Sequence, residues 1–153
     1  MNAGKAFFDT NVLLYMYSSA DVRKQARARD LYRECALANR ILLSTQVVQE
    51  FFVAGLRKLT LPRQQVREVT AAFLDSPLVT VGPSHIRAAI ENEDRYNISF
   101  WDALIVAAAE SGSAEVLYTE DLNDGQQYGA VLVRNPFSFP VDPVSTNLTA
   151  PKL

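Results

Sequence analysis

The chain has 153 residues, 48% of them hydrophobic, which suffices for one core of ordinary size without a second domain. Its formal net charge is −2, with 15 Lys and Arg against 17 Asp and Glu, so no overall positive field attracts nucleic acid. Cys35 is the only cysteine, which excludes an intrachain disulfide, and no segment resembles a signal peptide or a membrane span, so we expect a cytoplasmic protein without a membrane partner.

Short apolar runs alternate with helical segments along the chain. Strands are predicted at residues 5–9, 41–43, 78–81, 116–119 and 130–133. Helices are predicted at residues 12–17, 21–39, 46–59, 62–74, 83–96 and 100–110. This alternation is typical of a parallel sheet with helices on both faces. Beyond residue 136 the composition changes to Pro, Ser and Thr, so we expect one domain at 1–136 and an extended or disordered tail at 137–153.

Asp9 stands between the apolar residues 7–8 and 12–14. A carboxylate in this position loses hydration, and an unpaired buried charge is costly or is neutralised by a pKa shift. One interpretation is that Asp9 or Thr10 only caps the helix that follows. The other places Asp9 at the carboxyl end of a parallel strand, the edge where open α/β sheets bind their ligands.

Two helices carry features that indicate partners. The helix at 21–39 has a basic side formed by Arg23, Lys24, Arg27 and Arg33. Such a run is usually a solvated face and less often a surface for RNA or a partner. The helix at 46–59 has an apolar stripe formed by Val48, Phe52, Leu56 and Leu59. Glu50 lies nearly opposite, also among apolar residues, which suggests that this helix contacts the sheet on one side and a cleft or a second subunit on the other.

Acidic residues come near the carboxyl ends of the predicted strands. Asp9 ends the first strand, Glu50 lies one turn into the helix after the second, and Asp121 follows the strand at 116–119. Asp102 opens the helix at 100–110, where Ser99 is a candidate N-cap, so capping alone explains Asp102. Capping does not explain four acids at one edge, because like charges raise one another's pKa unless a cation is present.

An all-carboxylate cluster favours Mg²⁺ or Mn²⁺ over zinc and suits cleavage of phosphodiester bonds. One or two metals bind a phosphate oxygen, lower the pKa of a bound water for in-line attack, and neutralise the developing charge. Thr10, Asn11 and Thr119 can hydrogen-bond the carboxylates or the phosphate, and each is equally an ordinary turn or cap residue. His85, the only histidine, is expected to be a surface or capping residue and not a metal ligand.

Four segments resemble, in order and spacing, the motifs of PIN-domain ribonucleases, especially bacterial VapC-type toxins. They are FFDTNVLLY, the Glu of TQVVQEFF, the Asp of SFWDALIVAAA, and LYTEDLNDGQ. The resemblance covers residues 5–136 and implies a three-layer α/β/α sandwich on a mostly parallel sheet. It also implies an endoribonuclease dependent on Mg²⁺ or Mn²⁺, a homodimer, and a cognate antitoxin protein that blocks the site.

Carried over to this sequence, the resemblance assigns the catalytic and metal-binding acids to Asp9, Glu50, Asp102 and Asp121. Thr119 takes the place of a hydroxyl near the metal. The last motif also contains Asp124, so the fourth acid is either Asp121 or Asp124.

Other classes of protein match the sequence less well. Phosphotransferases of the haloacid-dehalogenase type carry a second Asp two residues after the first, and Asn11 occupies that place here. The chain has no G-x-x-x-x-G-K-[ST] or G-x-G-x-x-G motif, which argues against nucleotide-binding folds. The remaining alternative is a non-catalytic PIN-fold module that binds RNA or serves as a scaffold.

Overall fold

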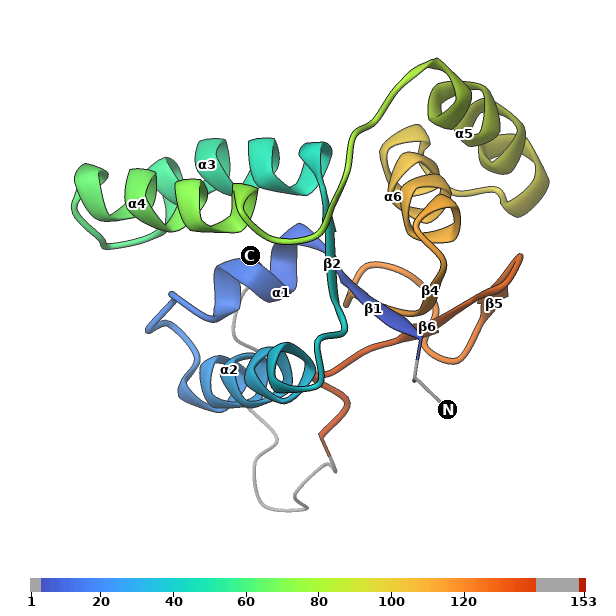
Figure 1. Ribbon diagram of the computed structural model, residues 1–153. Coiled ribbons are helices and arrows are strands. Elements are labelled where there is room, and N and C mark those ends of the chain that lie inside the picture. The colour runs from blue at the N-terminus through green and yellow to red at the C-terminus, as the bar shows by residue number, and fades with distance from the viewer. Residues whose placement is uncertain (1–3, 140–151) are drawn as a thin grey trace.

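In the computed structural model, which describes residues 4–139 and 152–153, a six-stranded sheet lies between layers of helices (Figure 1). The strands are β1 (Lys5–Phe8), β2 (Ile41–Ser44), β3 (Leu78–Val79), β4 (Ala114–Tyr118), β5 (Gln127–Tyr128) and β6 (Val131–Arg134). Their order is β3-β2-β1-β4-β6-β5, and every pairing is parallel except that of β5 with β6. The mostly parallel sheet was predicted and is confirmed.

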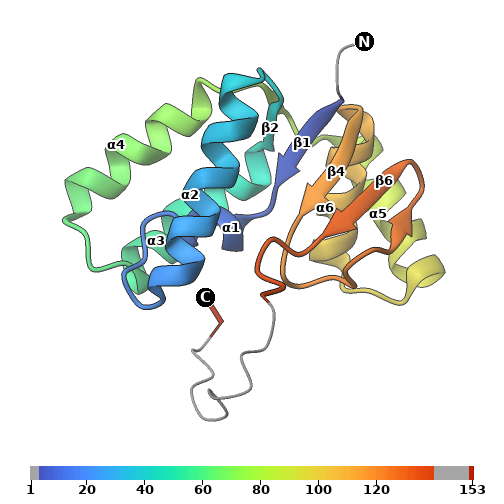
Figure 2. The same ribbon diagram turned by 90° about the horizontal axis from the view of Figure 1, so that it is seen from below.

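Six helices of the described residues flank this sheet. They are α1 (Thr10–Tyr15), α2 (Val22–Leu37), α3 (Thr45–Lys58), α4 (Arg63–Leu74), α5 (Pro83–Tyr96) and α6 (Phe100–Ser111). From below, α2 lies in front of the sheet and α6 behind it (Figure 2). α5 packs on α6, and α3 lies beside α4. The three-layer arrangement is therefore confirmed, and no helix in the described ranges is long and apolar enough to cross a membrane.

The position of β1 at the centre of the sheet explains its composition. Phe7 and Phe8 point to opposite faces and are both fully buried, as a central parallel strand requires. Phe8 pairs with Tyr118 of β4, and the backbone N–H of Asp9 donates to the Tyr118 carbonyl at 3.0 Å. Asp9 and Thr119 therefore leave the sheet side by side.

One strand was missed in the sequence. Gln127 and Tyr128 form β5, which pairs with β6 across a turn at Gly129. Gly129 has a φ of 57°, a left-handed conformation that glycine adopts without steric cost. β6 begins at Val131 and not at residue 130. A strand of two residues is too short for apolar alternation to reveal.

The buried face of α3 differs from the predicted stripe. Val47, Val48 and Phe51 are buried, whereas Phe52 and Leu56 are only half-buried. Phe52 and Leu56 still pack against the core, and the side of α3 that carries Glu50 and Val53 lines the cleft, so the predicted contact on two sides is confirmed. His85, in contrast, caps α5 as expected, since its Nδ1 accepts a hydrogen bond from the backbone N–H of Gly82 at 3.0 Å.

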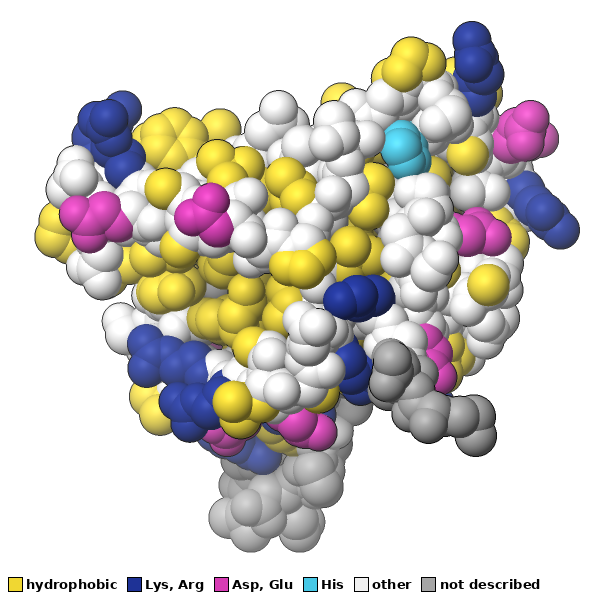
Figure 3. All heavy atoms as spheres, in the orientation of Figure 1, with side chains coloured by type: hydrophobic (Ala, Val, Ile, Leu, Met, Phe, Trp, Pro, Cys, Tyr) yellow, Lys and Arg dark blue, Asp and Glu magenta, His cyan; other side chains and the backbone are white. Residues whose placement is uncertain are grey.

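The basic side of α2 is not wholly solvated, contrary to the simpler expectation. Arg33 is exposed, but Lys24 is half-buried and its Nζ lies 3.0 Å from Glu120 Oε2. Arg27 Nε donates to the carbonyl of Pro136 at 3.2 Å. Lys and Arg side chains nevertheless gather over α2, and hydrophobic side chains lie between α2 and α4 (Figure 3).

The first residues of the predicted tail pack on the domain. Phe137 is buried, with its ring centre 4.8 Å from that of Tyr15 in an edge-on arrangement. The guanidinium of Arg23 lies 4.3 Å from the centre of the Phe139 ring. Residues 140–151 lie outside the described residues, so the expectation of an extended or disordered tail stays a prediction.

Candidate active site

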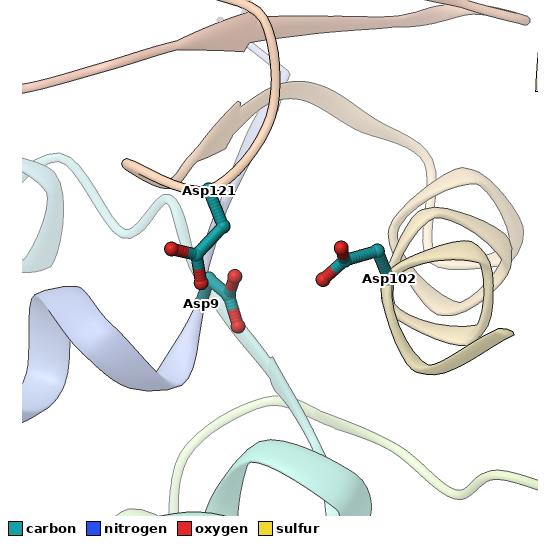
Figure 4. A group of neighbouring side chains, drawn as sticks. All are labelled: Asp9, Asp102 and Asp121. Carbon is teal, nitrogen blue, oxygen red and sulfur yellow. The ribbon is translucent and has the colours of Figure 1, made fainter. Parts of the chain in front are cut away.

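Three aspartates from separate elements meet at the carboxyl edge of the sheet. Asp9 follows β1, Asp121 follows β4, and Asp102 lies in the first turn of α6. One carboxylate oxygen of each lies within 4.8 Å of the others. Asp102 points away from its helix, across a gap, toward Asp9 and Asp121 (Figure 4). The structure thus brings together three of the four acids that the sequence singled out.

Asp9 both caps a helix and belongs to this cluster. Its Oδ1 accepts a hydrogen bond from Thr10 N at 2.7 Å, and Asp9 is the N-cap of α1. Burial raises the pKa of Asp9 from 3.8 to about 7; hydrogen bonds from Thr119 and Thr10 oppose this, and the charges of Asp121 and Glu50 add to it. The two interpretations of Asp9 are therefore compatible.

Asp102 likewise combines two roles. Ser99 is the N-cap of α6, as the sequence suggested, and its hydroxyl accepts a hydrogen bond from Asp102 N at 3.1 Å. The backbone of Asp102 serves the cap, while its carboxylate faces the cluster. Burial raises the pKa of the Asp102 carboxyl, a hydrogen bond with Ser99 opposes this, and the charges of Asp121 and Glu50 raise it further.

Asn11 and Thr119 form a buried frame that joins Asp9 to Asp121. Thr119 Oγ1 donates to Asp9 Oδ2 at 2.8 Å and accepts from Asp121 N at 3.1 Å. Asn11 Nδ2 lies 2.9 Å from Asp121 Oδ2 and 3.2 Å from Thr119 Oγ1, and it donates to both. These contacts fix the orientation of two carboxylates that repel each other.

Glu50 faces the same cleft but lies outside the group of three. Thr10 Oγ1 donates to Glu50 Oε2 at 3.0 Å, and Gln46 Nε2 donates to Oε1 at 2.7 Å. Both oxygens are thus held by neutral donors. The half-buried side chain completes one wall of the cleft.

The structure separates the two candidates for the last acid. Asp121 lines the cleft, whereas Asp124 accepts hydrogen bonds from Asn135 N at 2.9 Å and from Ser138 Oγ at 3.4 Å. Asp124 therefore supports the turn before β5 and the segment after β6. The geometry favours Asp121 over Asp124 as a member of the cluster.

The cleft has a volume of about 440 Å³. Its floor carries the acids, and its walls are partly apolar, with Leu14, Val53, Trp101 and Ile105. Arg57, Lys58 and Leu153 also line it. Such a groove is large enough for part of a flexible polymer chain to lie over the carboxylates.

Comparison with known proteins identifies the family. The family model of the PIN domain matches residues 6–124. This chain belongs to the PIN-domain family. A search of curated protein sequences found no match.

Solved structures with this PIN fold include three toxin proteins or complexes. A toxin–antitoxin complex from Klebsiella pneumoniae is 19% identical, covers 88% of this chain and 100% of that chain, and has a TM-score of 0.66. VapC20 of Mycobacterium tuberculosis, a toxin that cleaves the sarcin–ricin loop, is 18% identical, with 74% and 87% covered and a TM-score of 0.61. FitAB bound to a DNA fragment is 17% identical, with 89% and 98% covered and a TM-score of 0.64. At sequence identities of 17–19%, this structural similarity establishes a shared fold and carries no conclusion about activity.

One buried acid of this PIN domain escaped the sequence analysis. Glu120, between Thr119 and Asp121, is only 7% exposed. Tyr15 OH donates to its Oε1 at 2.9 Å, and Lys24 Nζ binds its Oε2 at 3.0 Å. Its partners lie about a hundred residues away in the sequence, so no local pattern indicated that Glu120 turns inward. The pair anchors the segment that carries Asp121 to α1 and α2.

Proposed function

We propose that this PIN domain is a metal-dependent endoribonuclease and the toxin of a toxin–antitoxin system. The observation that carries the proposal is the convergence of Asp9, Asp102 and Asp121 without a cation: within the described ranges, the only ion pairs are Lys24–Glu120 and Arg40–Glu115. Family membership supports it, as does the description of VapC20 as an RNA-cleaving toxin.

The donor set fits Mg²⁺ or Mn²⁺. All three groups are carboxylates, with no histidine or thiolate among them, and such hard oxygen donors suit these ions. Two oxygens bound to one Mg²⁺ lie at most about 4.2 Å apart, because each Mg–O distance is about 2.1 Å. Asp9, Asp102 and Asp121 would be the residues that hold the ion.

The chain's own residues hold this site in a reactive arrangement. When bound, the metal polarises a phosphate oxygen and lowers the pKa of a bound water. Thr119 and Asn11 keep Asp9 and Asp121 oriented toward the cleft. Glu50, held by Thr10 and Gln46, adds negative charge from α3 and is the fourth acid of the proposed site. The partly apolar walls limit competing solvent.

The test is cleavage of RNA under control of the metal. We expect excess EDTA to abolish cleavage by the purified protein and Mg²⁺ or Mn²⁺ to restore it. An Asp102→Asn protein purified in parallel controls for contaminating ribonucleases and should be inactive. Full cleavage in excess chelator contradicts the metal mechanism, and metal binding without cleavage of any RNA supports the scaffold alternative.

Two protein partners belong to the proposal. Structural neighbours are complexes of toxins with antitoxins, which supports a cognate antitoxin that covers the cleft. A homodimer is proposed because large apolar side chains are exposed on α3, α4 and α5, namely Val53, Leu74, Ile86 and Ile90. Light scattering at micromolar concentration tests the dimer, and a monomer with undiminished cleavage contradicts it.

A further inference from the structure

Trp101 is a large hydrophobic side chain that stays exposed at the rim of the acidic cleft. It is 64% exposed, immediately precedes Asp102, and lines the cleft. The ring of Phe100 packs against it edge-on, with centres 5.2 Å apart and planes at 72°. Phe100 itself packs on a small buried hydrophobic cluster under α5 and α6. The indole is thus braced by its neighbour and still presents much of its surface outward.

The cleft also carries positive charge, at the end of α3 opposite to Gln46 and Trp101. Arg57 and Lys58 end α3, are exposed, and are the only cations among the described residues that line the cleft. The floor of the cleft is acidic and the chain has a net charge of −2, so a polyanion receives no help from the protein's overall charge. These two cations provide the local compensation that phosphates need.

Two buried acceptors in the cleft lack donors. Asn11 Oδ1 and Gln46 Oε1 have no hydrogen-bond partner among the described residues. Gln46 Nε2 donates to Glu50 at 2.7 Å and to the backbone carbonyl of Trp101 at 3.3 Å. This amide therefore ties the segment that carries Trp101 to the acidic side of the cleft.

We propose that Trp101 is a stacking platform for an unpaired nucleobase next to the scissile phosphate, with more distant phosphates of the same strand bound by Arg57 and Lys58. The inference rests on the proposed nuclease function and adds the residue that contacts a base of its single-stranded RNA substrate. Bases in a duplex are covered by their neighbours, whereas an unpaired base offers a free face to an aromatic side chain.

Fluorescence tests the platform directly, because Trp101 is the only tryptophan in the chain. A single-stranded RNA oligonucleotide is titrated, in Mg²⁺, into the full chain carrying Asp9→Asn, which prevents consumption of the RNA. We expect saturable quenching of the Trp101 emission by the single strand and little quenching by the same sequence within a perfect duplex. Equal quenching by both forms, or none by either, overturns the proposal.

Kinetics supply an independent readout. Trp101→Ala should raise KM for single-stranded RNA by about tenfold with a smaller change in kcat, since base–aromatic stacking contributes to binding by about this factor or more. Trp101→Phe keeps an aromatic face and should stay close to wild type. Leu37→Ala is the matched control, because Leu37 is 83% exposed on α2 and lies outside the cleft lining. An unchanged KM in Trp101→Ala contradicts the platform.

The outcomes separate this proposal from the nuclease function. Quenching by single-stranded RNA without any cleavage by the wild type leaves the platform standing and removes the nuclease. If the wild type cleaves RNA and the KM of Trp101→Ala is unchanged, the nuclease function stands and the platform is wrong. If Trp101→Ala instead turns a dimer into a monomer while RNA fails to quench the wild type, the indole is covered by a second copy and the platform is wrong.

Discussion

Asp9 and Glu120 lie just beyond the ends of the neighbouring strands β1 and β4 and are almost equally buried, yet their surroundings differ. Asp9 is 6% exposed and Glu120 is 7% exposed. Glu120 has a lysine 3.0 Å away and a tyrosine hydroxyl 2.9 Å away, so its charge is neutralised within the fold. Asp9 has only neutral donors, and the charges of Asp121 and Glu50 repel it.

This difference in partners indicates that Asp9, unlike Glu120, has no compensating cation among the described residues. Burying a carboxylate is costly unless a partner compensates, and the fold supplies that partner to Glu120 through Lys24 of α2. At Asp9 it supplies hydrogen bonds but no positive charge, and burial raises the pKa to about 7. Under the proposed function, a divalent ion would supply the missing charge. Variants of the two clusters should therefore behave in opposite ways.

The largest effect is expected at Asp102. In Asp102→Asn the neutral side chain relieves repulsion in the metal-free protein and keeps the N–H that binds Ser99, so the melting temperature should stay equal or rise. Cleavage should fall by about a hundredfold or more, because one metal ligand is lost. Melting curves and cleavage rates check both halves.

The matched control for Asp102→Asn is Asp124→Asn, which lies outside the cleft and should cleave at nearly the wild-type rate. An Asp102→Asn protein that melts lower but cleaves normally would show that Asp102 only caps α6.

The next effect is expected at Thr119, which orients two carboxylates without belonging to the cluster. Thr119→Val keeps the shape and removes the hydroxyl that binds Asp9 and Asp121 N. Loss of such an orienting group usually costs about 10–100-fold in metal affinity or activity. Thr70→Val is the control, because the Thr70 hydroxyl bonds only the Val66 carbonyl of its own helix. Unchanged Mn²⁺ affinity in Thr119→Val speaks against the frame.

Glu120→Gln should show the opposite pattern to Asp102→Asn. It leaves the partly buried Lys24 without a carboxylate, and we expect a loss of about 1–3 kcal/mol in the free energy of unfolding. Cleavage at temperatures well below the transition should fall less than about tenfold. Adding Lys24→Met should recover part of the lost stability, as measured by denaturant unfolding. Equal stability of Glu120→Gln and wild type contradicts a structural role for the pair.

The last effect is a dependence of stability on pH, with no expected change in the fold. Because burial raises the pKa of Asp9 from 3.8 to about 7, the folded metal-free protein binds this proton more tightly than the unfolded chain does. Stability should therefore decrease as pH rises from about 4 to 7, by at most about 1.4 kcal/mol per pH unit, and level off above 7. Melting in EDTA checks this. In Asp9→Asn, stability should depend less on pH. Stability of the wild type that increases as pH rises from about 4 to 7 would contradict the raised pKa of Asp9.

Much of this arrangement was visible in the sequence. Parallel strands end at one edge, so a buried strand that runs into Asp9 and another that runs toward Asp121 had to bring these acids together. Asp102 was visible through its capping position after Ser99. These features depend on local pattern and on a rule of sheet topology.

The misses have a common physical cause, which is contact between distant segments. Glu120 was overlooked, and Lys24 was assigned to a basic side of its helix, because neither carries local evidence of the other, 96 residues away. The burial of Val47 and Phe51 in α3 was missed because α1, α4 and β2 all contact this helix. The strand β5 exists only through its pairing with β6 across Gly129. Tertiary contact overrode the local pattern in each case.

Titration calorimetry of the metal-free protein with Mn²⁺ at pH 7.5 tests most directly the claim that the aspartate cluster awaits a divalent ion. We expect the wild type and Glu120→Gln to bind with similar affinity, and Asp102→Asn to bind at least about tenfold more weakly. Similar affinities in all three proteins, or no binding by the wild type at millimolar Mn²⁺, would contradict the claim.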